Sequence, residues 1–163
     1  MKFATPLAAV ALSLFATTAS AQAVRTEKNM SLDLANQIAA ATVASCSASS
    51  YNVTAAVVDR AGTLRALQRA DNAGTHTVGA AQGKAFTSAS ARANTSAMLE
   101  NVQKNPGAQT LVDIPGFLVL GGGVPVRVGN EVIGAVGVGG APGGHLDEQC
   151  ANAGIAKVAE LLK

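Results

Sequence analysis

The chain has 163 residues, with 12 Lys and Arg against 10 Asp and Glu, and only 3% of its residues are aromatic. A nearly balanced charge without a basic run, and with few rings to stack on bases, disfavours nucleic acid as a partner. Seventeen glycines and no tryptophan predict one domain with a thin core of small side chains. Assembly into a homo-oligomer is one way to bury more surface.

The N-terminus predicts export. Lys2 precedes an uncharged apolar stretch over residues 3–18, and the small residues 19–21 suit a signal peptidase, so we expect cleavage after Ala21 and a mature chain of about 142 residues. No stretch reaches the roughly 18 apolar residues that a membrane-spanning helix needs. The sequence therefore predicts a periplasmic or secreted protein with no integral membrane segment after processing.

Residues 22–30 are predicted to form a flexible N-terminal segment ahead of one domain over residues 31–163. Ser31 can cap the first helix with its side-chain oxygen, and Asp33 in the first turn suits the positive end of the helix dipole. Apolar residues keep a helical spacing as far as about Ser49, where we expect this helix to end.

A β-hairpin is predicted to follow the first helix. Residues 51–58 and 63–68 have the composition of antiparallel strands, and the turn-forming residues 59–62 lie between them. A loop over residues 69–74 then leads to the second helix.

The second helix is predicted to run to about Asn94, with either Thr75 or Thr77 as its cap. Its apolar positions recur with helical spacing. Gly79 and Gly83 lie four residues apart, so a neighbouring backbone could approach this helix closely.

The C-terminal half predicts a long ordered segment, three strands and a closing helix. Residues 95–115 combine a short helix at 96–102 with Pro and Gly, which favours a long loop that covers another part of the molecule. The three predicted strands are 117–120, 124–128 and 131–138. A glycine-rich link over 139–144 then leads to the closing helix.

The order of these elements predicts an α+β fold. It gives a five-stranded antiparallel sheet with helices packed on it, in a profilin-like or PAS-like three-layer arrangement.

The two cysteines, Cys46 and Cys150, fall in the first and last predicted helices. In an oxidising compartment we expect them to pair, and the bridge would staple the two terminal helices together. The alternative is two buried free thiols. A metal site normally needs more ligands than these two.

Five segments of the chain form a recognisable combination: Val57–Gly62, Arg69–Thr77, Lys84–Thr87, Gly121–Val126 and Gly134–Ala141. Together they resemble the GlcG/HbpS-like family. The resemblance covers nearly the whole mature chain and implies the five-stranded fold and a homo-oligomer. One secreted branch of that family is associated with haem binding and redox sensing, and other members are associated with glycolate or diol use.

His76 is the first candidate for a functional side chain. It lies in a loop before the second helix, within one of the matching segments, and haem iron most often takes a histidine as its axial ligand. The amides that open the helix at Thr75, with Arg69 or Lys84 nearby in sequence, can receive a carboxylate or haem propionate. The alternative is that His76 is a surface or capping residue.

Three further residues are weaker candidates for ligand binding. Arg69 and Asp71 emerge from the second strand and can orient a small polar ligand, or simply tie down a loop as an exposed ion pair. His145 opens the last helix, where Asp147 and Glu148 are better explained as partners of the helix dipole than as catalysts.

The leading hypothesis is an exported protein that binds haem or a related small molecule and is not an enzyme. The alternative is an enzyme or accessory protein for a small hydroxy or oxo acid, in which Arg69 holds the carboxylate and His76 moves a proton.

Overall fold

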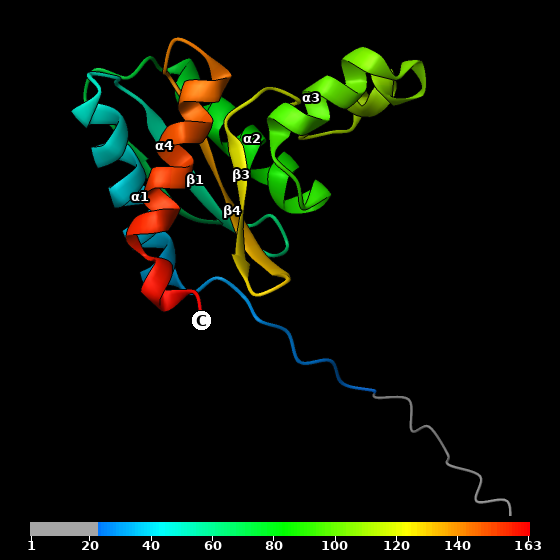
Figure 1. Ribbon diagram of the computed structural model, residues 1–163, viewed down its shortest axis with the longest axis horizontal. Coiled ribbons are helices and arrows are strands. Elements are labelled where there is room, and N and C mark those ends of the chain that lie inside the picture. The colour runs from blue at the N-terminus through cyan, green and yellow to red at the C-terminus, as the bar shows by residue number, and fades with distance from the viewer. Residues whose placement is uncertain (1–22) are drawn as a thin grey trace, which may run out of the picture.

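The computed structural model describes residues 23–163, so the predicted signal peptide lies outside the described residues (Figure 1). The segment 23–30 has no helix or strand and leads to Met30, which is buried and whose amide donates to the carbonyl of Ile133 at 3.1 Å. None of the described helices is long and apolar enough to cross a membrane.

The sheet has four antiparallel strands in the order β2-β1-β4-β3, and the α+β prediction is confirmed. The strands β1 and β2 form the first hairpin, and β3 and β4 form the second. Their bounds are Thr54–Asp59 for β1, Leu64–Arg69 for β2, Gly123–Val128 for β3 and Glu131–Gly139 for β4.

The prediction of a fifth strand at residues 117–120 is wrong. Gly116 precedes this segment with a φ of +85°, which turns the chain, and Leu118 donates its amide to the Thr87 hydroxyl at 2.7 Å. The amide of Leu120 bonds to the carbonyl of Leu118 at 2.9 Å. Because its amides are used in these contacts, the segment crosses the second helix of the fold and does not join the sheet.

Helices cover both faces of the sheet, which gives three layers. The helices α1 (Leu32–Ala48) and α4 (Gly144–Lys157) pack side by side on one face, and α2 (His76–Ala91) packs on the other (Figure 1). Ser31 caps α1 as predicted, since its hydroxyl accepts a hydrogen bond from the amide of Leu34 at 3.2 Å.

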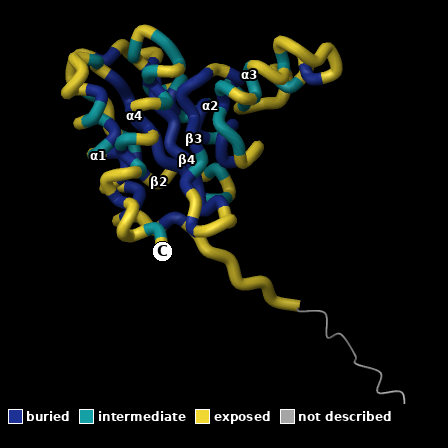
Figure 2. The backbone as a smooth tube through the Cα atoms, viewed as in Figure 1, coloured by how far each residue is buried: buried dark blue, intermediate teal, exposed yellow. Residues whose placement is uncertain are grey.

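The two faces have different cores. Between the sheet and the α1/α4 pair lie branched aliphatic side chains such as Ile38, Val57 and Val136, all fully buried. Between the sheet and α2 the contacts are mostly alanines, among them Ala81 and Ala85. The deepest part of the molecule is therefore the centre of the sheet, where β1 and most of β4 are buried, whereas the edge strand β2 is mostly exposed (Figure 2).

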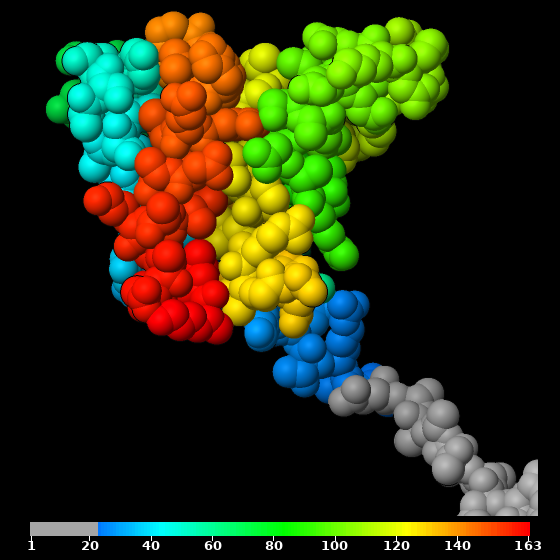
Figure 3. All heavy atoms as spheres, viewed as in Figure 1, coloured from blue at the N-terminus to red at the C-terminus, as the bar shows by residue number. Residues whose placement is uncertain are grey.

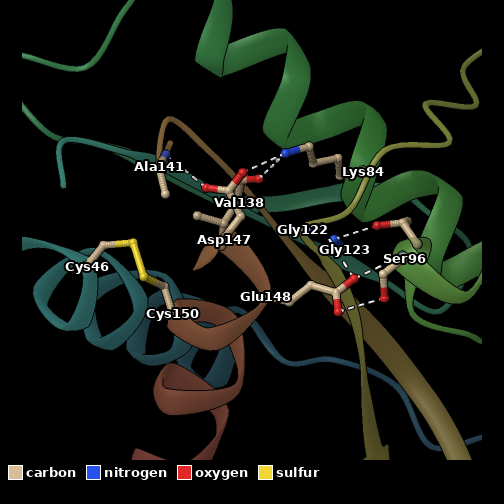
Figure 4. Close-up of polar contacts among 11 residues, drawn as sticks. Cys46, Lys84, Ser96, Gly122, Gly123, Val138, Ala141, Asp147, Glu148 and Cys150 are labelled. Carbon is tan, nitrogen blue, oxygen red and sulfur yellow. Dashed lines mark hydrogen bonds and ion pairs between the residues drawn. A yellow bond between two sulfur atoms is a disulfide. The ribbon is translucent and has the colours of Figure 1, made fainter. Parts of the chain in front are cut away.

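The predicted disulfide is present. Cys46 in α1 and Cys150 in α4 are joined across 104 residues, with their Cα atoms 5.3 Å apart. The bridge ties together the two helices of one face (Figure 4).

Residues 95–115 form an arm that projects from the body (Figures 1 and 3). The arm consists of α3 (Thr95–Lys104) and the 3-10 helix η1 (Pro106–Asp113), followed by a short turn. The short helix predicted at 96–102 is confirmed and is longer, whereas the predicted covering loop is helical. Its buried residues within this chain are Thr95, at its base, and Ala108. A second 3-10 turn, η2 (Ala159–Leu161), ends the fold.

Candidate functional site

A polar cavity of about 340 Å³ lies between the starts of α2 and α4. The end of β4 and the glycine-rich loop 139–143 close its third side. The glycines predicted only as a link therefore form a wall of the cavity. Its lining residues are His76, Thr77, Ala80, Lys84, Leu120, Gly139, Gly140, Ala141, Pro142, Gly143, Gly144 and Asp147.

Two helix N-termini meet at this cavity, and neither is capped by a side chain. The N-cap residue of α2 is Thr75 and that of α4 is Gly143, and neither makes a side-chain capping bond. Amides in the first turn of a helix have no partner within the helix, and the dipole there is positive. The cavity therefore presents two positive helix ends to an anionic group.

Thr75 is the N-cap residue of α2, as predicted, but neither Thr75 nor Thr77 makes a side-chain capping bond. Thr75 has helical backbone angles, with φ −58° and ψ −35°, whereas a capping residue needs an extended conformation. The Thr77 hydroxyl is instead buried, where it donates to the carbonyl of Gly74 at 2.6 Å and meets the Thr54 hydroxyl at 2.7 Å. This arrangement leaves the first amides of α2 without a capping hydroxyl.

A buried ion pair lies at the wall of the cavity (Figure 4). Lys84 Nζ is 2.7 Å from Asp147 Oδ2 and 2.9 Å from the carbonyl oxygen of Val138, and both charged side chains are 3% exposed. The other carboxylate oxygen of Asp147 accepts the amide of Ala141 at 3.0 Å. The pair thus joins α2, the end of β4, the glycine-rich loop and α4 around one cavity.

The charge state of Asp147 is set by two opposed effects. Burial raises the pKa of its carboxyl above the ordinary value of 3.8, while the hydrogen bond and charge of Lys84 and the amide of Ala141 lower it. Burial is the larger effect. Because an ammonium has three donors and two are used, Lys84 retains one N–H for a ligand in the cavity.

Glu148 holds the neighbouring elements in place (Figure 4). Its carboxylate accepts the amide of Ser96 at 3.0 Å, the hydroxyl of Ser96 at 2.8 Å and the amide of Gly122 at 3.3 Å. These bonds join α4 to the base of the arm and to the start of β3. Asp147 and Glu148 therefore do more than the dipole pairing that the sequence predicted for them.

The cavity brings together two of the six side chains predicted to bind a ligand, His76 and Lys84. His76 is exposed at its mouth and Lys84 is buried in its wall. The others lie outside its lining. Arg69 donates to the carbonyl of Ala73, and Asp71, Thr75 and His145 are exposed to solvent.

The lining of the polar cavity offers one imidazole to iron, that of His76. Over residues 23–163, no three His, Cys, Asp or Glu side chains lie close enough to hold a metal ion together. A haem needs one axial protein ligand, since the macrocycle supplies four nitrogens. His76 meets that requirement.

Comparisons with known proteins agree on one family. A family model described as "Haem degrading protein HbpS-like" matches residues 30–156. Protein GlcG of Escherichia coli K12 is 36% identical over 115 residues, which are 71% of this chain and 84% of GlcG.

Solved structures give the same result. A double mutant of HbpS from Streptomyces reticuli is 36% identical, with a TM-score of 0.79 over 96% of this chain and 99% of that one. The ORFY protein of Klebsiella pneumoniae is 27% identical, with a TM-score of 0.80 over 85% of this chain and 97% of that one.

Proposed function

This chain belongs to the HbpS-like family, and on that basis we propose that it binds haem at the polar cavity, with His76 as the axial ligand of the iron. The observation that carries the proposal is the exposed imidazole of His76 at the mouth of a cavity that two helix N-termini enter.

The donor groups of the cavity fit haem. The imidazole of His76 can coordinate iron, and the positive ends of α2 and α4 can receive a propionate carboxylate. The remaining N–H of Lys84 can add a charge-assisted hydrogen bond to that carboxylate. Bound haem would supply redox-active iron, and the residues of this chain would bind and orient it.

The size of the cavity limits how much of the haem it can hold. Its volume of about 340 Å³ is at the lower end of ligand pockets, and a porphyrin is larger than that. The cavity would therefore bind one polar edge of the haem, and most of the ring would lie outside it.

Titration with haemin tests the role of His76. The oxidised protein without residues 1–21 should give a saturable shift of the Soret band, and His76→Ala should weaken binding about tenfold or more. His145→Ala is the matched control, because His145 is also exposed but does not line the cavity. Identical spectra for the wild type and His76→Ala would remove His76 as the iron ligand.

A small carboxylic acid is the second candidate ligand. The modest volume of the cavity and its two positive helix ends favour it, with Lys84 holding the carboxylate in place of Arg69. Calorimetric titration with glycolate and pyruvate, beside the haemin titration, separates the two. Binding of either acid without haemin binding would favour this second ligand.

We also propose that the protein is exported. The disulfide between two buried cysteines supports this, because such bonds persist in oxidising compartments. Fractionation of cells that express the full chain would find it in the periplasm or the medium, in a form shortened at its N-terminus. Retention of the full-length chain in the cytoplasm would contradict the proposal.

A further inference from the structure

An apolar pocket of about 570 Å³ lies on the side of α2 that faces β2. The role proposed for the polar cavity does not involve this pocket. Its side-chain walls are almost wholly apolar, with one amide among them, and they come from β1, β2, α2 and the crossing segment 117–120. They comprise Val58, Leu64, Gln82, Phe86, Phe117 and Leu118.

The aromatic wall of this pocket is held in a fixed position. Phe86 lies between Gly62 and Gly116, whose φ angles of +82° and +85° favour glycine. A Cβ at Gly62 would lie 2.7 Å from the Phe86 ring, and one at Gly116 would lie 3.2 Å from it. Phe117 meets Phe86 edge to face, with ring centroids 6.0 Å apart. Two rings at a fixed angle make a preformed apolar corner.

The apolar pocket and the polar cavity share α2 and the crossing segment. Adjoining rows of α2 line the two sites, with His76, Ala80 and Lys84 in the cavity and Gly79, Gly83 and Phe86 in the pocket. In the crossing segment, Leu118 lines the pocket and Leu120 lines the cavity. The two sites are thus neighbours along one helix.

Gly79 leaves the helix surface between the two sites without a side chain. A Cβ built at this position meets no heavy atom within 4 Å, although the residue lines the pocket and lies one turn from His76. Glycine inside a helix costs stability relative to alanine. At Gly79 neither a close backbone contact nor a positive φ explains it.

We infer that the apolar pocket is the second compartment of a single tetrapyrrole site, and that it receives the apolar part of the ring that the polar cavity is too small to hold. This inference rests on the proposed function. The ring contacts the Phe86–Phe117 corner and the backbone at Gly79, while His76 and the helix N-termini engage the iron and a propionate.

Gly79→Leu tests the inference. A Cβ at this position meets no heavy atom within 4 Å, and the leucine side chain would occupy space in the pocket that Gly79 lines. It should leave the melting temperature unchanged or raised, since leucine is a better helix former than glycine. It should weaken binding of both haemin and metal-free protoporphyrin IX about tenfold or more. Ala91→Leu is the control, on an exposed residue at the far end of α2.

The metal-free porphyrin separates the two compartments. His76→Ala should weaken binding of haemin but not of protoporphyrin IX, followed by the fluorescence of the porphyrin. A wild type that binds neither compound would overturn the proposed function together with this inference.

Two other outcomes would overturn the inference and leave the proposed function standing. In the first, Gly79→Leu binds both porphyrins as the wild type does. In the second, Gly79→Leu changes the sedimentation of the ligand-free protein while porphyrin affinity stays constant, which would make the pocket a contact between copies of the chain.

Discussion

The two faces of the sheet differ in what their side chains do. On the α1/α4 face, fully buried aliphatic residues such as Ile38 and Val136 form the larger core, and the disulfide ties the helices together. On the α2 face the core is mostly alanine, and the apolar pocket opens there. The polar cavity lies at the edge of this face, where the start of α2 meets the start of α4. The larger core and the two ligand sites therefore occupy different parts of the molecule.

The thin core of the α2 face has a structural cause. Gly137 in β4 lies so close to α2 that a Cβ there would be 2.1 Å from the carbonyl oxygen of Ala81. Such a close approach brings the polar backbone of the strand end and of the helix start to one place. The small residues of this face thus help to bring the walls of the polar cavity together.

The largest expected effect is loss of the disulfide, through Cys46→Ala with Cys150→Ala. The bridge closes a loop of 104 residues, for which the loss of chain entropy corresponds to about 4 to 5 kcal/mol at most. Urea unfolding should show this loss. Haemin affinity, measured where the variant is still folded, should change little, because the bridge lies on the α1/α4 face.

A change in haemin affinity as large as the change in stability would contradict the separation of the larger core from the ligand sites. Such a result would mean that α4, which carries both Cys150 and Asp147, transmits strain from the bridge to the cavity.

Much of the fold could be predicted from the sequence, because local signals and packing agree. Ser31 as a cap and the spacing of apolar residues predict α1, and the turn-forming residues 59–62 predict the first hairpin; both elements are present. The strand prediction for residues 117–120 fails because an apolar run between glycines is typical of a strand. Their amides bond to Thr87 and within the segment, and that depends on tertiary contacts.

The candidate site could be predicted only in part. His76 stood out because it lies in a segment shared with a known family, and Lys84 because it lies in another. Asp147 is 63 residues from Lys84, and nothing local indicates that they pair. Asp147 also has the sequence pattern of an acidic residue that interacts with the helix dipole at a helix start. That local role explains the residue without a tertiary ion pair.

The second expected effect concerns Lys84→Met, which leaves Asp147 buried without its partner. Removal of one member of a buried ion pair costs about 3 to 5 kcal/mol. Urea unfolding should show that loss, and Lys84→Met with Asp147→Asn should recover most of it. Lys104→Met is the control, because its pair with Glu100 is exposed and contributes about 0.5 kcal/mol or less.

Equal stability of the single and double variants would contradict this explanation. It would show that Lys84 contributes through its bond to the Val138 carbonyl and its packing, and not through Asp147. The ion pair would then not contribute to the stability of the contact between α2 and α4.

The smallest expected effect is the pH dependence that Asp147 confers. Burial raises the pKa of its carboxyl above the ordinary value of 3.8, so the native state binds this proton more tightly than the unfolded chain does. Where the native state holds more protons, stability falls as the pH rises. The stability of the wild type relative to Asp147→Asn should therefore fall as the pH rises from 3.8 through the folded pKa.

Urea unfolding of both proteins between pH 3 and pH 7 measures the sign of this difference, and the sign decides between two forces. A relative stability that falls with pH means that desolvation outweighs the attraction of Lys84, as the raised pKa requires. A relative stability that rises with pH would mean that the ion pair outweighs burial. Asp147 would then stabilise the α2 face as an anion, and the separation of the larger core from the ligand sites would be less sharp.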